Sequence, residues 1–130
     1  MEFTQEVRKA TDPIYQKISK VMPEIEWSVH APYIHEINKL KKEKNAVILA
    51  HNYQTPEIYH GVADFAADSL ALAIEASKTS ADIILMAGVH FMAGTAKLMS
   101  PEKKVILPDM DAGCSLSSSI TGKDVRLLKE

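Results

Sequence analysis

AVILAHNYQTPE, residues 46–57, begins with a short apolar run and turns polar at His51. Residues 46–50 are continuously apolar and include β-branched side chains, which is typical of a strand that is buried on both faces. Four hydrogen-bonding side chains follow, and Thr55-Pro56 favours the start of a short helix. The stretch therefore predicts one strand of a parallel sheet that ends at a polar turn.

Two further apolar runs resemble the first. They lie at residues 83–87 and 105–107, and Pro108 closes the second of them. Helical patterns occupy residues 70–78, where Asp68-Ser69 offers a cap, and 90–99, after a turn at Gly88. Buried strands that alternate with helices predict a small three-layer α/β/α domain. Its short parallel sheet has three or four strands joined by right-handed crossovers.

The first 44 residues are predicted to be helical. Apolar side chains recur at three- and four-residue spacing up to Val21, and Asp12-Pro13 predicts the start of a fresh helix. Met22-Pro23 ends it, and a second helix is predicted over residues 32–44. We therefore expect an N-terminal helical arm at 1–45 and an α/β domain at 46–130.

Composition excludes several classes of protein. The chain has 130 residues, 46% of them hydrophobic and 25% charged, and a net charge of −2, which suits a single globular domain. The lysine-rich run at 40–45 is interrupted by Glu43, so no nucleic-acid partner is expected. No apolar run approaches the roughly 18 residues of a membrane span, and the charged N-terminus does not resemble a signal peptide. Cys114 is the only cysteine, which fits a reducing compartment, and we expect a cytoplasmic protein.

Three polar turns follow the three predicted strands, at residues 51–54, 88–92 and 108–115. Ligands of open parallel sheets bind beyond the carboxyl ends of the strands, so these turns are predicted to meet at one edge. His51 either closes its strand by hydrogen bonding or serves as an acid, base or anion partner. Tyr53 is explained by packing as well as by chemistry. Ser69 suits a helix cap, an anion holder at a helix start, or both.

The remaining candidates in these turns are two aspartates and the cysteine. Asp109 and Asp111 are either paired carboxylates or ordinary polar loop residues. Cys114 lies among small neighbours in AGCSLS, residues 112–117. It is a small buried hydrophobe, a nucleophilic thiol activated by a histidine, or a thiolate ligand of a metal or iron–sulfur cluster. One thiolate does not hold a cluster, so in the last case its companions lie elsewhere.

Taken together, several motifs resemble one known family. HNYQ (51–54), DSL (68–70), GVHFMA (88–93), TAK (95–97), SPEK (100–103) and AGCSL (112–116) occur in an order that is specific to quinolinate synthase. The resemblance covers about Val47 to Val125 with nearly no gaps. It is strongest after the helical arm.

The resemblance implies an iron–sulfur enzyme of NAD biosynthesis, a transferase that condenses iminoaspartate (iminosuccinate) with dihydroxyacetone phosphate to quinolinate, phosphate and water. An aspartate-oxidising enzyme supplies the iminoaspartate. The family has three similar α/β domains, and each contributes one cysteine to a [4Fe-4S] cluster whose open iron acts as a Lewis acid. By position, Cys114 matches a cluster ligand, His51 and Ser69 match holders of the iminoaspartate carboxylates, and Tyr53 matches a tyrosine of the acid–base steps.

This sequence departs from the family pattern in two ways. Gly94 stands where the family usually has Glu, and full-length members are well over twice as long. We therefore expect the first domain of a quinolinate synthase, inactive alone. Two alternatives remain open: a stand-alone module that binds a small dicarboxylate or phosphate, and a Cys–His hydrolase that uses Cys114 and His51.

Overall fold

The computed structural model describes residues 1–129, and residue 130 of the expected α/β domain lies outside them. Within that range, four parallel strands form one sheet in the order β2-β1-β3-β4. The strands are β1 (Ala46–His51), β2 (Phe65–Ala67), β3 (Ile83–Ala87) and β4 (Lys104–Ile106). The predicted α/β fold with a short parallel sheet is confirmed.

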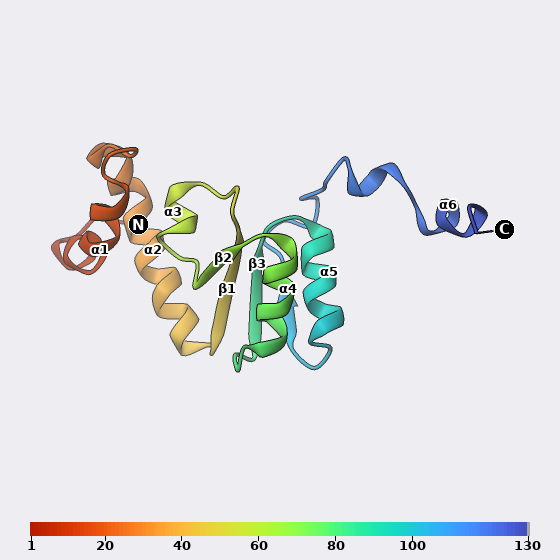
Figure 1. The fold of residues 1–130 in the computed structure, drawn as a ribbon. Helices are drawn as coiled ribbons and strands as arrows, with labels where there is room; N and C mark the ends of the chain where they lie inside the picture. The colour runs from red at the N-terminus through yellow and green to blue at the C-terminus, as the bar shows by residue number, and fades with distance from the viewer. Residues whose placement is uncertain (130) are drawn as a thin grey trace.

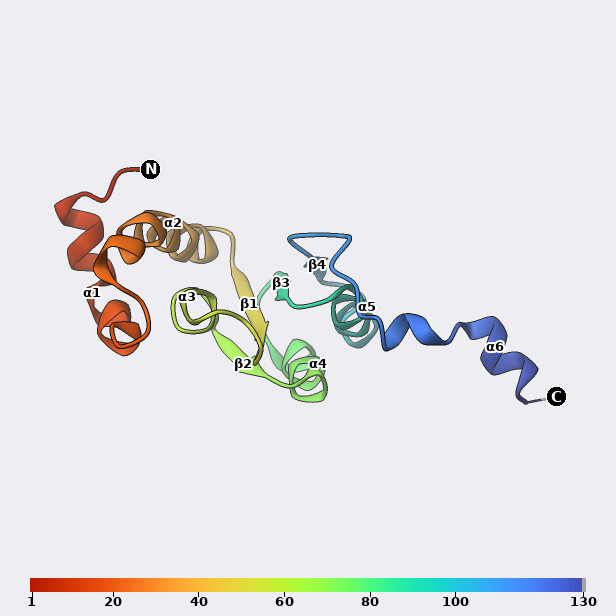
Figure 2. The same cartoon turned by 90° about the horizontal axis from the view of Figure 1, so that it is seen from above.

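Helices cover both faces of the sheet (Figure 2). On one face lie α2 (Glu24–Glu43) and α3 (Pro56–Tyr59), and on the other lie α4 (Ser69–Lys78) and α5 (His90–Met99). Alternate residues of β1 enter two separate cores. Ile48 packs with Trp27 on the α2 face, whereas Leu49 packs with Leu72 and Met86 on the α4 face. Continuous burial of β1 thus follows from helices on both sides.

The N-terminal helices differ from the prediction at two prolines. α1 (Gln5–Ile18) runs through Pro13, where a fresh helix was expected, and α2 begins at Glu24 and runs through Pro32. A proline inside a helix costs about 3 kcal/mol, because one backbone hydrogen bond is lost. Tertiary burial offsets that cost. Trp27 is 2% exposed and stacks on Tyr15 with 5.4 Å between the ring centroids.

Asp64 joins α2 to the sheet. Its Oδ2 accepts a hydrogen bond from the backbone N–H of Ile48 at 2.8 Å, and its Oδ1 accepts one from Lys41 Nζ at 2.8 Å. Lys41 Nζ also donates to the carbonyl of Val62 at 2.7 Å. Only 12% of the Lys41 side chain is exposed. This cluster fixes the helix against the strand that carries His51.

The C-terminal segment projects from the domain (Figure 1). Residues 115–129 are all exposed and contain a short 3-10 turn, Ser117–Ser119, and α6 (Gly122–Leu127). Thr121 and Asp124 form a capping box at the start of α6. Local capping rather than packing therefore defines this helix.

Candidate functional site

The carboxyl ends of the strands form one edge. His51 at the end of β1 lies opposite Ala67 at the end of β2, and Ala50 lies opposite Ala87 at the end of β3. The backbone N–H of Asn52 continues this register by donating to the Ala67 carbonyl at 3.1 Å. The predicted turns at 51–54 and 88–92 therefore begin at neighbouring strand ends of this edge.

His51 and Tyr53 are in direct contact. Their ring centroids are 4.1 Å apart, and the backbone N–H of Tyr53 points at His51 Nδ1 over 3.4 Å. Because Nδ1 faces a donor, the neutral imidazole carries its proton on Nε2. His51 is half-buried, so Nε2 is the atom with which this side chain can hold a ligand.

Gly88 keeps the floor of this site open. A Cβ at Gly88 would lie 3.7 Å from the Tyr53 hydroxyl, 3.8 Å from His51 Cβ and only 2.8 Å from Met92 Sδ. From the sequence alone Gly88 is only a turn residue. Its position directly after a buried strand, at the ligand edge, is the signal that identifies it as part of the site.

The loop that carries Cys114 is attached to the start of α5. The backbone N–H of His90 donates to the Ala112 carbonyl at 2.7 Å, and the Cys114 carbonyl accepts from Ser118 N–H at 2.9 Å. The thiol is free and half-buried. Among residues 1–129 it forms no hydrogen bond with His51, so the contact that a Cys–His hydrolase requires is absent there.

The pKa of Tyr53 depends on burial and on the charge of Cys114. Burial raises the pKa of the Tyr53 phenol, a thiolate at Cys114 raises that pKa further, and a backbone contact from Val89 acts in the opposite direction. The net pKa lies above its ordinary value of 10.0. The phenol is protonated at neutral pH. Its ring contacts the His51 ring, and the charge of Cys114 contributes to its raised pKa.

Ser69 is not the helix cap that its position predicts. The N-cap of α4 is Asp68, whose carboxylate accepts from Ala71 N–H at 2.9 Å, and Ser69 is the first helical residue. Its side chain is half-buried, and within the described part of the chain its hydroxyl has no hydrogen-bond partner. Because Ser69 closely follows Ala67, it starts at the same edge as His51.

Asp109 has a local structural role. Its Oδ1 accepts from the backbone N–H of Asp111 at 2.8 Å, which is an Asx turn. Both residues are exposed, so the polar-loop interpretation holds and paired carboxylates are not needed.

The donor atoms fit only one corner of an iron–sulfur cluster. Over residues 1–129, no group of three His, Cys, Asp or Glu side chains is placed to hold a metal ion. Cys114 alone offers a partly accessible thiolate, the donor that such clusters use. Any cluster at this edge would thus need its other ligands from outside this range.

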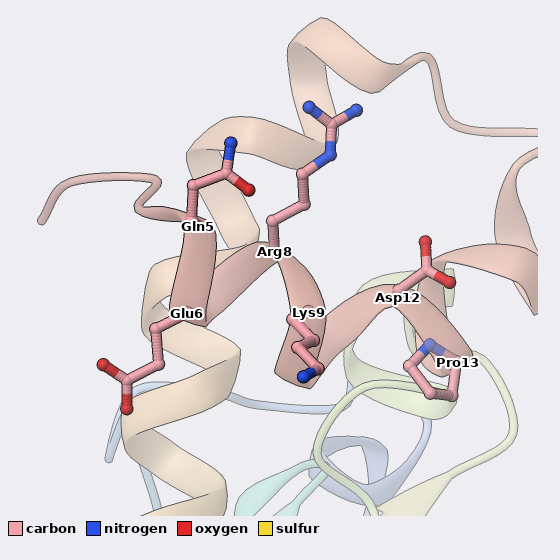
Figure 3. Close-up of a pocket in the computed structure, with 6 residues that line it drawn as sticks. All are labelled: Gln5, Glu6, Arg8, Lys9, Asp12 and Pro13. Carbon is pink, nitrogen blue, oxygen red and sulfur yellow. The ribbon is translucent and has the colours of Figure 1, made fainter.

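A separate hollow of about 720 Å³ lies along α1 (Figure 3). It is formed by one helix, and its side chains spread apart rather than converge on a point. Arg8 forms an ion pair with Glu24 of α2. This hollow is open surface without a convergent set of groups, so the carboxyl edge remains the candidate site.

Comparison with known proteins settles the family. The model of the quinolinate synthetase A protein family (NadA) matches residues 35–130. The chain belongs to the quinolinate synthase family. It is 60% identical to the quinolinate synthase of Sinorhizobium medicae (strain WSM419) over 130 residues, which are 100% of this chain and 36% of that protein.

Two other quinolinate synthases show similar identity. That of Caulobacter vibrioides (strain NA1000 / CB15N) is 61% identical over 128 residues, 98% of this chain and 35% of the relative. That of Xylella fastidiosa (strain 9a5c) is 65% identical over 97 residues, 75% of this chain and 29% of the relative. The chain thus spans about a third of the length of the first two relatives. Among the helices of residues 1–129, none has the length and apolar character to cross a membrane.

Proposed function

We propose that this chain provides part of the active site of a cytoplasmic quinolinate synthase of NAD biosynthesis. The reaction joins iminoaspartate, supplied by an aspartate-oxidising enzyme, to dihydroxyacetone phosphate and releases quinolinate, phosphate and water. The observation that supports the proposal is the contact of His51 with Tyr53 at the carboxyl edge of the sheet, in a member of this family. With Ser69 and Cys114, these are the four residues to which we assign roles.

His51 and Ser69 hold the dicarboxylate. The imidazole Nε2–H and the serine hydroxyl are donors at the same edge, and neither is needed by the fold, because Asp68 caps α4 and His51 uses Nδ1 toward Tyr53. Hydrogen bonds to a carboxylate are stronger than bonds between neutral groups. Two such donors would orient iminoaspartate against the strand ends.

Tyr53 holds a proton close to the substrate. The phenol is protonated at neutral pH and can donate to a developing negative charge, and its raised pKa keeps it protonated to a higher pH than a free tyrosine. Its ring also lies against the His51 ring, which limits the rotation of the imidazole. Gly88 leaves space beside both side chains for a ligand.

Cys114 would hold one iron of a [4Fe-4S] cluster. When bound, that group supplies a Lewis acid for substrate oxygen atoms. The remaining ligands do not come from residues 1–129, where Cys114 is the free cysteine, and the isolated chain is therefore expected to be inactive. The arm at 1–45 and the α/β domain at 46–130 act together in this role, since α2 packs on β1.

A chimera tests the proposal directly. This chain replaces the aligned 130 residues of the S. medicae enzyme, and quinolinate is measured after anaerobic iron–sulfide reconstitution. We expect activity in the chimera, loss of the cluster absorption and of activity in Cys114→Ser, and a raised KM for iminoaspartate in His51→Ala and Ser69→Ala. Leu98→Ala, a change of an exposed side chain on α5, is the matched control. An active chimera whose Cys114→Ser variant keeps its cluster would contradict the proposed ligand.

The free Ser69 hydroxyl and His51 Nε2 also suit a stand-alone dicarboxylate-binding module. Calorimetric titration of the 130-residue chain with malate separates this second candidate from the first. Micromolar binding that is abolished by His51→Ala would favour the module. Absence of binding favours a site that is complete only with further residues.

A further inference from the structure

Gln54 connects the carboxyl ends of two neighbouring strands. Its backbone N–H donates to the His51 carbonyl at 3.0 Å, which closes the turn after β1. Its side chain is half-buried, and Nε2 donates to the carbonyl of Ala87, the last residue of β3, at 3.2 Å. One residue therefore closes the turn that carries Tyr53 and also ties that turn to the next strand.

The Ala87 carbonyl lies beyond the part of β3 that pairs with β4. That pairing runs from Ile83 to Leu85 and ends two residues before Ala87. Ala87 is 8% exposed, and a backbone carbonyl so close to the core is stabilised by a donor. The Gln54 amide thus supplies a donor where the pairing with β4 has ended.

Tyr53 lies against the residue that follows Ala87. A Cβ at Gly88 would be 3.7 Å from the Tyr53 hydroxyl and 3.8 Å from His51 Cβ. Two adjacent side chains of the turn, those of Tyr53 and Gln54, are therefore placed against two adjacent residues at the end of β3. The hydrogen bond of Gln54 limits the movement of the backbone from which the Tyr53 ring extends.

The turn alone does not require a long amide side chain. The bond from Gln54 N–H to the His51 carbonyl is a backbone bond, which any residue except proline can make. Pro56 begins α3, and proline suits the first position of a helix by its own geometry. The bond to Ala87, in contrast, needs a donor at the end of a long side chain. The link between the strands therefore explains the glutamine better than the turn does.

We propose that Gln54 is a positioning residue, which holds the 51–54 turn on the end of β3 and so keeps the Tyr53 hydroxyl beside Gly88 and the Tyr53 ring on His51. Gln54 acts through Tyr53 rather than by touching the substrate. This role rests on the proposed function of Tyr53 as a proton donor. The link between turn and strand is independent of that function and is measured separately.

Nuclear Overhauser effects in the 130-residue chain test the link. The native chain should show them between the Tyr53 ring protons and the Gly88 α-protons, because these groups are adjacent. Gln54→Met keeps the length of the side chain and removes the donor, so the signals should be lost. Gln54→Glu keeps the shape, and its carboxylate cannot donate to Ala87, so the same loss is expected.

Gln16→Met is the matched control, because Gln16 Nε2 also donates a side-chain hydrogen bond, to Asp12 on α1 at 2.7 Å. It should leave the signals unchanged, and circular dichroism confirms that each variant folds. Signals that persist in both Gln54 variants overturn the proposal. Their absence from the native chain overturns it as well.

Kinetics of the S. medicae chimera test the positioning role. Gln54→Met should lower kcat about tenfold with a smaller change in the KM for iminoaspartate, since a displaced proton donor affects the transition state more than binding. In a Tyr53→Phe background the same substitution should have little further effect, because the donor that Gln54 positions is already gone. Gln16→Met should leave both constants unchanged.

The two backgrounds distinguish positioning from a general loss of structure. A purely structural role would lower kcat equally with Tyr53 and with Phe at this position, and equal losses overturn the proposal. An inactive chimera that retains Gln54 would instead contradict the proposed function. In that case the nuclear Overhauser effects still decide whether Gln54 holds Tyr53 beside Gly88.

Discussion

Replacement of Asp64 by alanine is expected to destabilise the fold strongly, although 41% of the Asp64 side chain is exposed. The substitution leaves the N–H of Ile48, a residue that is 3% exposed in the central strand β1, without its acceptor at 2.8 Å. A buried donor without a partner costs about 1–3 kcal/mol. Lys41 keeps the Val62 carbonyl but loses its counterion, which adds about 1 kcal/mol. The expected loss is therefore about 2–4 kcal/mol.

Urea unfolding measures this loss as a lower midpoint with an unchanged slope. Asp64→Asn keeps a neutral acceptor for Ile48, so it should lose about 1 kcal/mol. Asp82→Ala is the matched control, because that carboxylate accepts from Asn45 Nδ2 at 2.8 Å on the exposed surface. The control should cost less than about 1 kcal/mol.

Comparison of the Asp64 and Asp82 variants tests whether the Ile48 N–H depends on Asp64 as its acceptor. Equal losses in Asp64→Ala and Asp82→Ala would refute the reasoning, because they would show that the Ile48 amide finds another partner. Lys41→Met combined with Asp64→Ala should be less destabilised than the two single losses added, since the combined change removes the unpaired ammonium.

Four further substitutions have defined outcomes. Gly61→Ala would place a Cβ 2.0 Å from the Glu57 carbonyl oxygen, so a loss of about 3 kcal/mol or failure to fold is expected in urea titration. A Cβ at Gly94 would meet nothing within 4 Å, so Gly94→Glu should raise stability by up to about 1 kcal/mol through helix propensity; a fall would show that the longer side chain clashes. The raised pKa of Tyr53 means that its contribution to stability is complete below pH 10.0 and is lost as the pH rises through the higher folded value. Tyr53→Phe should remove that alkaline loss, and Cys114→Ser should lower the pKa of Tyr53 in absorbance titration; an unchanged titration would exclude the electrostatic contact.

Much of the sheet follows from sequence because its two central strands are short continuous apolar runs. Residues 46–50 and 83–87 are continuous apolar runs, and both are strands in the structure. β2 is different. Phe65–Ala67 is as short as the edge strand β4, but it lacks the β-branched side chains that Val105 and Ile106 give to β4, so a sequence pattern does not detect it. Its strand character comes from pairing with Leu49 to His51.

The candidate site was likewise predicted only in part from the sequence. The sequence by itself determined the family motifs, the polar turns and the edge at which they lie, since parallel strands present their carboxyl ends together. Only the tertiary structure decided that the Tyr53 ring packs on His51, that Asp68 rather than Ser69 caps α4, and that Gly88 keeps the space beside Tyr53 and His51 open. These are contacts between distant segments or choices between adjacent residues. Local propensity does not distinguish them, because they depend on how helices and loops pack against the finished sheet.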